Sequence, residues 1–415
     1  MTPFPSIAED VIWSRVRNLL GLKKDMPIAQ AELKALALKV ALLSDYFTRR
    51  PGDKPDCYLG DSSLMAAYVA YFLPSNLTKI ERPLSEIFLH PELETGSGGE
   101  LSILDLGCGP GTASAGFMDF FFRKLCRDGA EIKLSITALD RVEANLKEAE
   151  SLLGELWNAY SSVYTGGPVL NFEINSINTD LLQLAGSGTI KKRHDLVFIS
   201  NSLVETAGGA AGIERRRELV ELIASDYLKE KGSIIIIEPA LKDASRDLLM
   251  LRESILREGR VNIYSPCLTI GRCGALDSSK DWCHEADEWE SPQIVRSLDG
   301  LTGFDKSRLN YSYLVLRQDG LALSDIYSEA SGDIFRVVSD LIKEKGKLKL
   351  FVCGKEGRAL VERLDRDRSE SNILLDSLRR GEIINVNPLY KKGPLFRLNK
   401  ESAVEKAGSP PVDTV

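Results

Sequence analysis

The chain contains no apolar run as long as the roughly eighteen residues that a membrane-spanning helix requires. Its first five residues have neither the charged segment nor the apolar segment of a secretion signal. Glu9 and Asp10 follow, whereas an organelle transit segment is rich in Arg and poor in acids. We therefore expect a cytoplasmic protein without a membrane partner.

An excess of positive charge is also lacking. The 60 Asp and Glu residues outnumber the 53 Lys and Arg residues, and the formal net charge is -7. We expect no DNA partner, and contact with RNA would depend on local clusters such as Lys191-Lys192-Arg193. The seven cysteines are an odd number in a chain without a secretion signal, which does not indicate a disulfide framework.

The 415 residues, 43% of them hydrophobic, are enough for about two to three folded units. Near the start, apolar residues recur at helical spacing, for example Ile12, Val16 and Leu19. The stretch Gly96-Ser97-Gly98-Gly99 marks a boundary. In chain order we predict a helical N-terminal unit (1–95), a main domain (96–320) with a cysteine-rich segment (263–295), a small β-rich C-terminal unit (332–400) and a disordered tail (401–415).

In the main domain, short β-rich runs alternate with helical runs, which predicts an α/β fold with a parallel sheet covered on both faces. The run at 233–238 is almost wholly apolar, as a strand buried on both faces should be. A last strand, at 310–317, is predicted to form the edge of this sheet. The strands predicted before it are 101–106, 133–139, 171–175, 195–200 and 233–238.

A glycine-rich loop follows the first predicted strand and precedes a helix, which is the context of a nucleotide-binding loop. Gly107, Gly109 and Gly111 let the backbone turn sharply and approach a ligand closely. Their G-x-G-x-G spacing differs from the G-x-G-x-x-G of dinucleotide dehydrogenases, and a compact adenosine with an amino-acid tail fits it better. We therefore predict a class I Rossmann domain of the S-adenosylmethionine-dependent methyltransferase type, with S-adenosylmethionine as its cofactor.

Three acids are predicted to contact that cofactor. Asp105 would accept from its ammonium group, Asp140 would bind the ribose hydroxyls, and Asp180 would accept from the adenine amino group. The alternative is a Rossmann-like glycine turn that holds no ligand. Cys108 is interpreted as a small packing residue, because no neighbour in sequence would lower the pKa of its thiol.

No catalytic residue is predicted. The segment 200–205, after the fourth strand, lacks the Asn-Pro-Pro-aromatic pattern typical of amine methylation, and it lacks a cysteine. Asn201 and Glu205 could face a substrate or could cap the next helix. Methyl transfer can depend largely on positioning, so the missing base does not exclude it.

Three cysteines, Cys267, Cys273 and Cys283, lie in one irregular segment, and Cys353 ends a predicted strand. Four thiols can form a closed metal site. Zinc sites usually contain pairs of cysteines about two to four residues apart, which are absent here, whereas iron-sulfur clusters tolerate wider spacing. His284 is an alternative fourth ligand or a donor to a ligand, and free cysteines buried in a loop are the remaining interpretation.

Taken together, these features resemble the small-ribosomal-subunit Rsm22 family, which includes the mitochondrial methyltransferase-like protein seventeen and bacterial relatives. The resemblance covers about residues 55–390 and rests on segments 71–76, 104–112, 237–239, 265–267, 281–284, 311–317 and 352–353. It implies a methyltransferase-like fold that binds the small ribosomal subunit or its RNA and acts in translation. It also implies a [4Fe-4S] cluster, with zinc as the alternative that spacing leaves open. The implied ligands are Cys267, Cys273, Cys283 and Cys353.

Two segments depart from the family pattern. Residues 268–272 lack an expected proline and histidine, and residues 285–289 are acidic where the family is aromatic and basic. Three functions stay open: methylation of ribosomal RNA or assistance in subunit assembly; a non-catalytic assembly factor whose cluster senses iron or redox state; and a small-molecule methyltransferase with a structural zinc site.

Basic residues of the C-terminal unit are a candidate RNA-facing surface, although interleaved acids make an ordinary solvated face the alternative. They are Arg363, Arg366, Arg368, Arg379, Arg380, Lys391 and Lys392.

Overall fold

The computed structural model describes residues 2–23, 26–49, 53–90, 99–125, 132–164, 170–184, 188–205, 209–393 and 395–407. Most of the predicted boundary at 96–99 and the end of the predicted tail lie outside these ranges. Within them, no helix is both long enough and apolar enough to cross a membrane. The cytoplasmic compartment stays a prediction.

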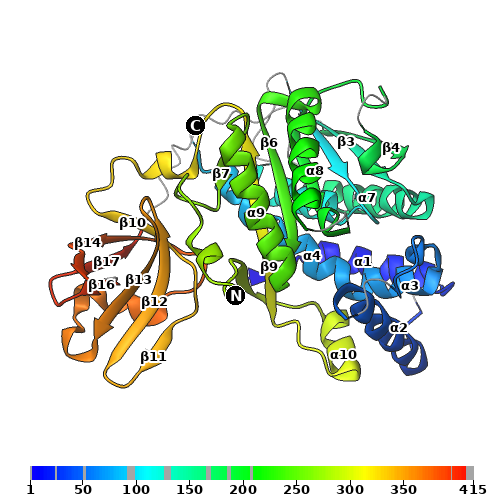
Figure 1. Cartoon of the computed structure of the whole chain (residues 1–415). Coiled ribbons are helices and arrows are strands. Elements are labelled where there is room, and N and C mark those ends of the chain that lie inside the picture. The colour runs from blue at the N-terminus through cyan, green and yellow to red at the C-terminus, as the bar shows by residue number, and fades with distance from the viewer. Residues whose placement is uncertain are drawn as a thin grey trace.

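A nine-stranded sheet occupies the middle of the molecule, with helices on both faces (Figure 1). Its parallel part has the order β4-β3-β2-β5-β6, and antiparallel β9 pairs with β6. This order is that of the class I methyltransferase Rossmann-like fold, so the predicted α/β class is confirmed. The strands are β2 (Glu100–Leu106), β3 (Ile132–Asp140), β4 (Leu170–Asn178), β5 (His194–Ser200), β6 (Leu228–Pro239) and β9 (Arg308–Arg317).

Strand β9 is not the edge of the sheet, and the sequence-based prediction was wrong on this point. Strands β7 (Asn262–Ser265) and β8 (Glu285–Glu290) both pair with its other side, and β1 (Thr2–Pro3) pairs with β8. These strands are short, and β8 contains four acids among its six residues, so neither composition nor periodicity indicated them. Segment 266–284 loops out between β7 and β8.

The two faces of the sheet have separate cores. Ile103 of β2 packs toward the N-terminal helices, whereas its neighbour Leu104 packs toward α8 and α9, because side chains alternate along a strand. The helical N-terminal unit therefore shares its core with the sheet. The first face carries α1 (Ser6–Leu19), α2 (Gln30–Thr48), α3 (Ser62–Ala67), α4 (Leu73–Lys79), α5 (Glu81–Ile87), α6 (Thr112–Phe120), α7 (Glu143–Val163) and α10 (Gln293–Thr302); the second carries α8 (Gly209–Leu222) and α9 (Lys242–Glu258).

Short 3₁₀ and π helices fill the connections of the described chain. They are η2 (Tyr58–Gly60), η3 (Tyr68–Phe72), η4 (Phe121–Leu125), η5 (Leu181–Gln183), η6 (Leu203–Glu205), η7 (Ile223–Tyr227), η8 (Gly274–Asp277), η9 (Leu323–Tyr327), η10 (Asp365–Asp367) and η11 (Glu370–Ser377).

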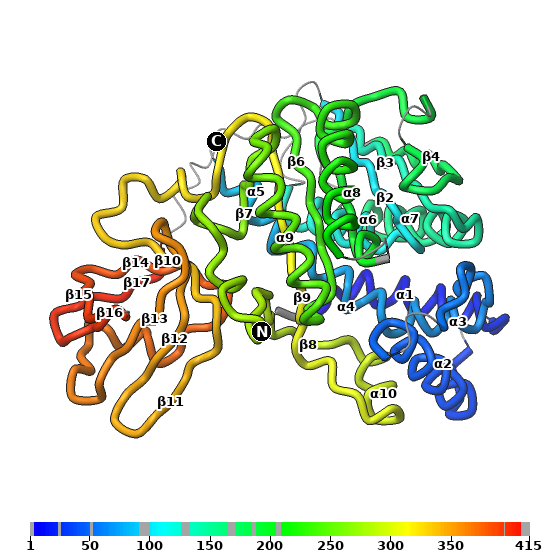
Figure 2. Tube along the Cα trace, viewed as in Figure 1, coloured from blue at the N-terminus to red at the C-terminus, as the bar shows by residue number. Residues whose placement is uncertain are grey.

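The C-terminal part is a separate eight-stranded sheet, seen on the left of Figure 2. β10, β12 and β13 form a meander, β14 returns beside β10, β16 pairs parallel with β13, and β17 pairs with β14. β16 and β17 are consecutive in the chain, and β16 pairs with β13 while β17 pairs with β14, so together they act as one strand that links the two ends of the order β13-β12-β10-β14. Counted in this way, the sheet is a five-stranded Greek-key barrel of the OB type, extended by β11 and β15. Its strands are β10 (Asp333–Val337), β11 (Ile342–Glu344), β12 (Lys347–Gly354), β13 (Gly357–Leu364), β14 (Ile383–Asn387), β15 (Tyr390–Lys392), β16 (Leu395–Leu398) and β17 (Ala403–Lys406).

The last strand corrects the predicted tail. Residues 401–415 were expected to be disordered, but Ala403–Lys406 form β17, and Val404 is buried in the barrel core. The run is only four residues long and half charged, so local composition could not identify it.

Candidate functional site

The glycine loop lies at the carboxyl ends of the parallel strands, where ligands bind in open α/β sheets. Gly107, Gly109 and Gly111 have φ values of 67°, 54° and 81°, a region that favours glycine. A Cβ on Gly107 would lie 2.8 Å from the Cβ of Ser202, whereas a Cβ on Gly109 would meet nothing within 4 Å. The backbone at Gly109 therefore borders open space in which a ligand can approach it.

Asp105, at the end of β2, is completely buried. Its Oδ2 accepts from the backbone N and the Oγ of Ser114, at 3.2 and 2.6 Å, and its Oδ1 has no hydrogen-bond partner among the described residues. Burial raises the pKa of Asp105 to about 6, although the Ser114 hydrogen bonds lower it. A buried acceptor without a partner costs stability, and a donor group of a ligand would satisfy it.

Stability should therefore depend on pH through Asp105. The folded chain keeps this proton up to about pH 6, whereas the unfolded chain releases it near pH 4. Folding thus takes up a proton in this window, and stability falls as pH rises through it, by about 2–3 kcal/mol. Asp105→Asn should remove this decline, measured as the difference between the urea-unfolding free energies of wild type and variant from pH 4.5 to 7.5. If the difference in unfolding free energy between wild type and Asp105→Asn does not change with pH, the raised pKa of Asp105 is refuted.

Asp140, at the end of β3, connects the neighbouring strand to the glycine loop. Its Oδ2 accepts from the backbone N of Gly109 at 2.9 Å, and its Oδ1 accepts from the backbone N of Val142 and the Nδ2 of Asn145. Asp105 and Asp140 are close enough that the charge of Asp140 raises the pKa of Asp105. The two carboxylates predicted to hold a cofactor therefore lie on either side of the glycine loop.

Asp180 lies at the same edge of the sheet, two residues beyond the β4 residue Asn178 that pairs with Asp140. Its Oδ1 accepts from the backbone N of Leu182 at 2.8 Å and caps η5. Its predicted contact with adenine stays a prediction. Cys108 is buried, and burial raises the pKa of its thiol well above the ordinary value, so the thiol stays protonated.

The structure adds two residues, at the carboxyl ends of β5 and β6, to the candidate site. Asn201 has a φ of 56° and is, among the described residues, the one non-glycine with a positive φ. Such a conformation is uncommon and tends to occur at functional sites. Glu238 is buried, and its Oε1 accepts from the backbone N of Leu203 and of Val204, which fixes η6 beside the glycine loop. No local pattern indicates this capping role, because the contact spans 35 residues.

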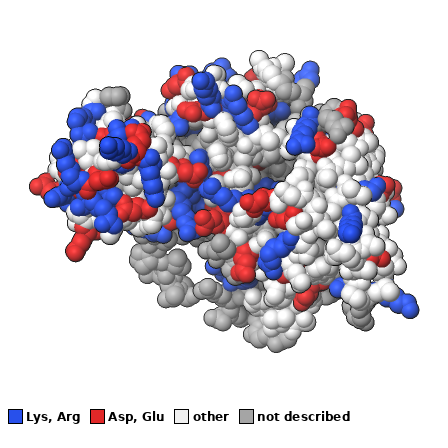
Figure 3. Space-filling model, turned by 90° about the horizontal axis from the view of Figure 1, so that it is seen from below, with Lys and Arg blue, Asp and Glu red and all other residues white. Residues whose placement is uncertain are grey.

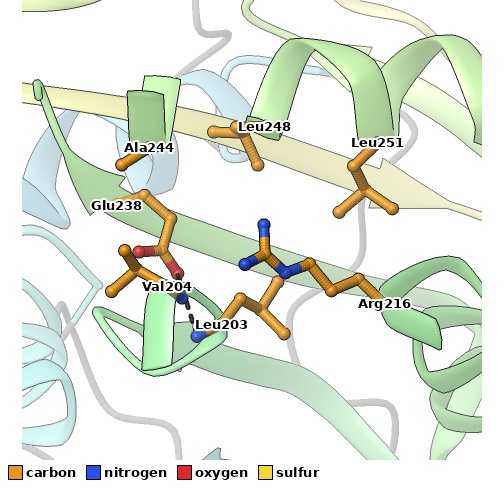
Figure 4. A pocket seen from close by; sticks show the side chains of 7 residues that line it. All are labelled: Leu203, Val204, Arg216, Glu238, Ala244, Leu248 and Leu251. Carbon is orange, nitrogen blue, oxygen red and sulfur yellow. Dashed lines mark hydrogen bonds between the residues drawn. The ribbon is translucent and has the colours of Figure 1, made fainter. Parts of the chain in front are cut away.

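A small pocket lies behind this region, between η6, α8, β6 and α9. Figure 4 shows Arg216 extending into it from α8, and this residue pairs with Asp247 at 2.9 Å. The cavity is about 10 Å³, roughly the volume that one water molecule requires. It is too small to be the site of a methyl acceptor. Its lining consists of Leu203, Val204, Arg216, Glu238, Ala244, Leu248 and Leu251.

The topology brings the four cysteines together. Cys267 follows β7 by two residues and Cys283 precedes β8 by two, and these strands pair with positions Val315 and Tyr311 of the same strand, β9. Both ends of the looped-out segment are therefore attached to the same strand, at positions four residues apart, and the charges of Cys267, Cys273 and Cys353 all act on Cys283. Cys353, on β12, is near this segment, since the Oγ1 of Thr269 donates to the carbonyl of Lys355 at 2.9 Å.

Helix α9 contributes two charged residues to this cluster. Arg252 is completely buried, and its Nε donates to the Sγ of Cys267 at 3.2 Å. The Oε1 of Glu253 accepts from the backbone N of Cys273 at 3.1 Å. Burial, together with the charge of Cys267, raises the pKa of Cys353 to about 12. Sequence analysis missed Arg252 and Glu253, because on a helix they are indistinguishable from ordinary charged residues.

The structure does not show the predicted metal site itself. Among the residues that it describes, no three His, Cys, Asp or Glu side chains form a group that could hold a metal ion. His284 stacks on Trp282, with ring centroids 5.9 Å apart. Burial, together with the charge of Arg380, lowers the pKa of His284 to about 4.

The predicted RNA-facing surface requires a correction. Arg363 is buried and donates to Asn372 and Asp376 of η11. Arg380 donates to the carbonyls of Val338 and His284 and thereby fixes the barrel against the cysteine segment. These two arginines have structural contacts because the barrel folds around them, which sequence proximity could not reveal.

The family model described as mitochondrial small ribosomal subunit Rsm22 matches residues 63–401. No curated protein matches the chain. The solved structure of NSun6 from Pyrococcus horikoshii with SFG has 13% sequence identity and a TM-score of 0.33, covering 60% of this chain and 52% of that one. An S-adenosylmethionine-dependent methyltransferase from Geobacter sulfurreducens in complex with S-adenosyl-L-homocysteine has 15% identity and a TM-score of 0.31, covering 59% and 91%.

Proposed function

The chain belongs to the Rsm22 family of mitochondrial small ribosomal subunit proteins, and from this membership we propose that it binds S-adenosylmethionine and acts on the small ribosomal subunit or its RNA. The action is either methylation of the RNA or assistance in subunit assembly. The observation that carries the cofactor assignment is the unpartnered Oδ1 of buried Asp105, beside the open space at Gly109.

The residues present fit this cofactor. Asp105 and Asp140 come from adjacent strands on either side of the glycine loop. The Oδ1 of Asp105 would accept from the ammonium group, and Asp140 would accept from the ribose hydroxyls. The bound cofactor supplies an activated methyl group. The chain itself positions the two reactants, and Asn201, at the carboxyl end of β5, is the described residue that we expect beside the acceptor.

The decisive experiment combines subunit binding with methyl transfer. The purified chain is sedimented with small ribosomal subunits, and transfer from radiolabelled S-adenosylmethionine to their RNA is measured for wild type and Asp140→Ala. Co-sedimentation with transfer that requires Asp140 supports a methyltransferase. Co-sedimentation without transfer supports a non-catalytic assembly factor. Failure of both would overturn the proposal and favour a small-molecule methyltransferase.

We also infer that Cys267, Cys273, Cys283 and Cys353 hold a [4Fe-4S] cluster. In support, four soft ligands are neighbours at the junction of the looped-out segment and β12, and buried Arg252 donates to one of them. A cluster is larger than one ion, so its thiols need not converge on a single point, and hydrogen bonds to the sulfurs tune such clusters. A guanidinium would also offset the negative charge of the thiolates.

Cys353→Ser should abolish this cluster. Protein purified without oxygen is expected to contain about four iron and four sulfide per chain, with broad absorbance near 400 nm, and the variant is expected to lose most of both. Cys57→Ser is the matched control, because Cys57 is exposed and lies outside the segment. Circular dichroism of the same samples separates cluster loss from unfolding. Stoichiometric zinc without sulfide, or a fully loaded Cys353→Ser variant, would refute the inference.

A further inference from the structure

One face of the C-terminal barrel combines cations with apolar side chains. Along β12, Leu348, Leu350 and Val352 point into the barrel core. The alternate residues Lys347, Lys349, Phe351 and Cys353 therefore point outward, and the residues paired with them on neighbouring strands share this side. We call this side, formed by β11, β12, β13, β16 and β15, the outer face.

Two rows of paired residues cross the outer face. In strand order, the first row is Ile342, Lys349, Glu362, Arg397 and Tyr390. The second row is Phe351, Leu360, Leu395 and Lys392. Each row thus contains an aromatic ring, at least one aliphatic side chain and at least one cation, and in the first row the ring of Tyr390 is next to Arg397.

Parts of these rows remain accessible. Tyr390 is 39% exposed and Ile342 is 37% exposed, large fractions for apolar side chains on a folded sheet. The guanidinium of Arg358 lies 4.3 Å from the ring centroid of Phe351 and pairs with Asp281, so Tyr390 is the more accessible ring of the two rows. Lys392 is exposed at the end of the second row. The face therefore offers ring and aliphatic surfaces with cations beside them.

The charge of the barrel differs from that of the remaining chain. Residues 333–406 contain 17 Lys and Arg against 12 Asp and Glu, a formal charge of +5, whereas the other residues sum to -12. Figure 3 shows Lys and Arg side chains gathered over the barrel on the left, with acids among them, and few charges on the right of that view. A polyanion would therefore be attracted to the barrel more than to the rest of the molecule.

We propose that the outer face of the barrel binds single-stranded RNA. This inference rests on the proposed function and names the part of the chain that contacts the RNA. Barrels of the OB type bind oligonucleotides on the face of their second and third strands and on the flanking loops. Here those strands are β12 and β13, and the loops carry the hairpin extensions β11 and β15. Bases stack on aromatic and aliphatic surfaces while cations follow the phosphates.

The test measures binding of a fluorescent single-stranded RNA of about 12 nucleotides to the full chain by anisotropy at several salt concentrations. Lys392→Glu should weaken binding about tenfold and reduce the salt dependence. Lys400→Glu, with the same charge change in the exposed turn before β17, should alter affinity less than twofold. Tyr390→Ala should weaken binding about 5- to 100-fold, and Tyr390→Phe should retain affinity because the stacking ring is kept.

The outcomes separate this inference from the proposed function. Equal effects of Lys392→Glu and Lys400→Glu, no effect of Tyr390→Ala, or stronger binding of a duplex RNA of equal length would overturn the inference. If the same preparation still co-sediments with small subunits, only the barrel surface is wrong. If wild type binds neither subunits nor the oligonucleotide, the proposed function fails as well.

Discussion

Replacement of Arg336 by Met is expected to lower the free energy of unfolding by about 3–5 kcal/mol, because it leaves the buried carboxylate of Glu86 without its cation and leaves buried Glu285 with Arg82 alone. Arg336, on β10, is 2% exposed, donates to the Oε1 of Glu86 at 2.7 Å, and lies 3.7 Å from the Oε1 of Glu285. The phenol of Tyr313 donates to the other oxygen of Glu86 at 2.6 Å. This network joins helix α5, the edge of the main sheet and the barrel, so the whole fold should be affected.

The matched control is Arg308→Met, which removes an exposed pair with Asp340 and should cost no more than about 1 kcal/mol. Urea unfolding of both variants, followed by fluorescence and circular dichroism, measures the difference. Burial raises the pKa of Glu285, and Arg336 is one of the groups that lower it. Without Arg336 that pKa should rise further, so the loss of stability should be smaller at pH 5 than at pH 8. Similar losses for both variants would contradict the prediction.

Asp140→Ala is expected to weaken S-adenosylmethionine binding at least about 100-fold. In the proposed complex, its Oδ2, which accepts one hydrogen bond from Gly109, accepts a second one from the ribose, and a hydrogen bond to a charged group contributes about 1.5–3 kcal/mol. The substitution also removes the acceptor for the backbone N of Gly109, so the glycine loop loses its connection to β3. Isothermal titration calorimetry with S-adenosylmethionine and with S-adenosylhomocysteine measures both effects.

Glu143→Ala is the control for Asp140→Ala. Glu143 is an acid three residues away, 69% exposed, and it pairs with Lys147 on the surface. The Glu143→Ala variant should bind the cofactor as tightly as wild type does. Asp140→Asn should have an intermediate effect, since it keeps an acceptor but loses the charge. Unchanged binding by Asp140→Ala would place the ribose elsewhere and refute the proposed role of Asp140.

The glycine loop and the parallel strands could be predicted from the sequence, because their signals are local. Backbone turns at Gly107, Gly109 and Gly111 depend on residue type, and apolar runs such as 233–238 are continuous. The predicted β9 was correct in extent within two residues, although its place in the sheet was not. The position of a strand within a sheet depends on which other strands pair with it, and this pairing is not determined by the local sequence.

The amino-acid sequence by itself determined the class of fold, the glycine loop with the two acids that end neighbouring strands, and the three candidate cysteines of one segment, because each is encoded by residue type and local pattern. Only the tertiary structure decided which distant residues meet. It joined β7 and β8 along β9, brought Arg252 to Cys267, and closed the barrel through β17. These contacts link positions far apart in the chain and are fixed by burial and strand pairing over the whole molecule, which no short segment of the sequence contains.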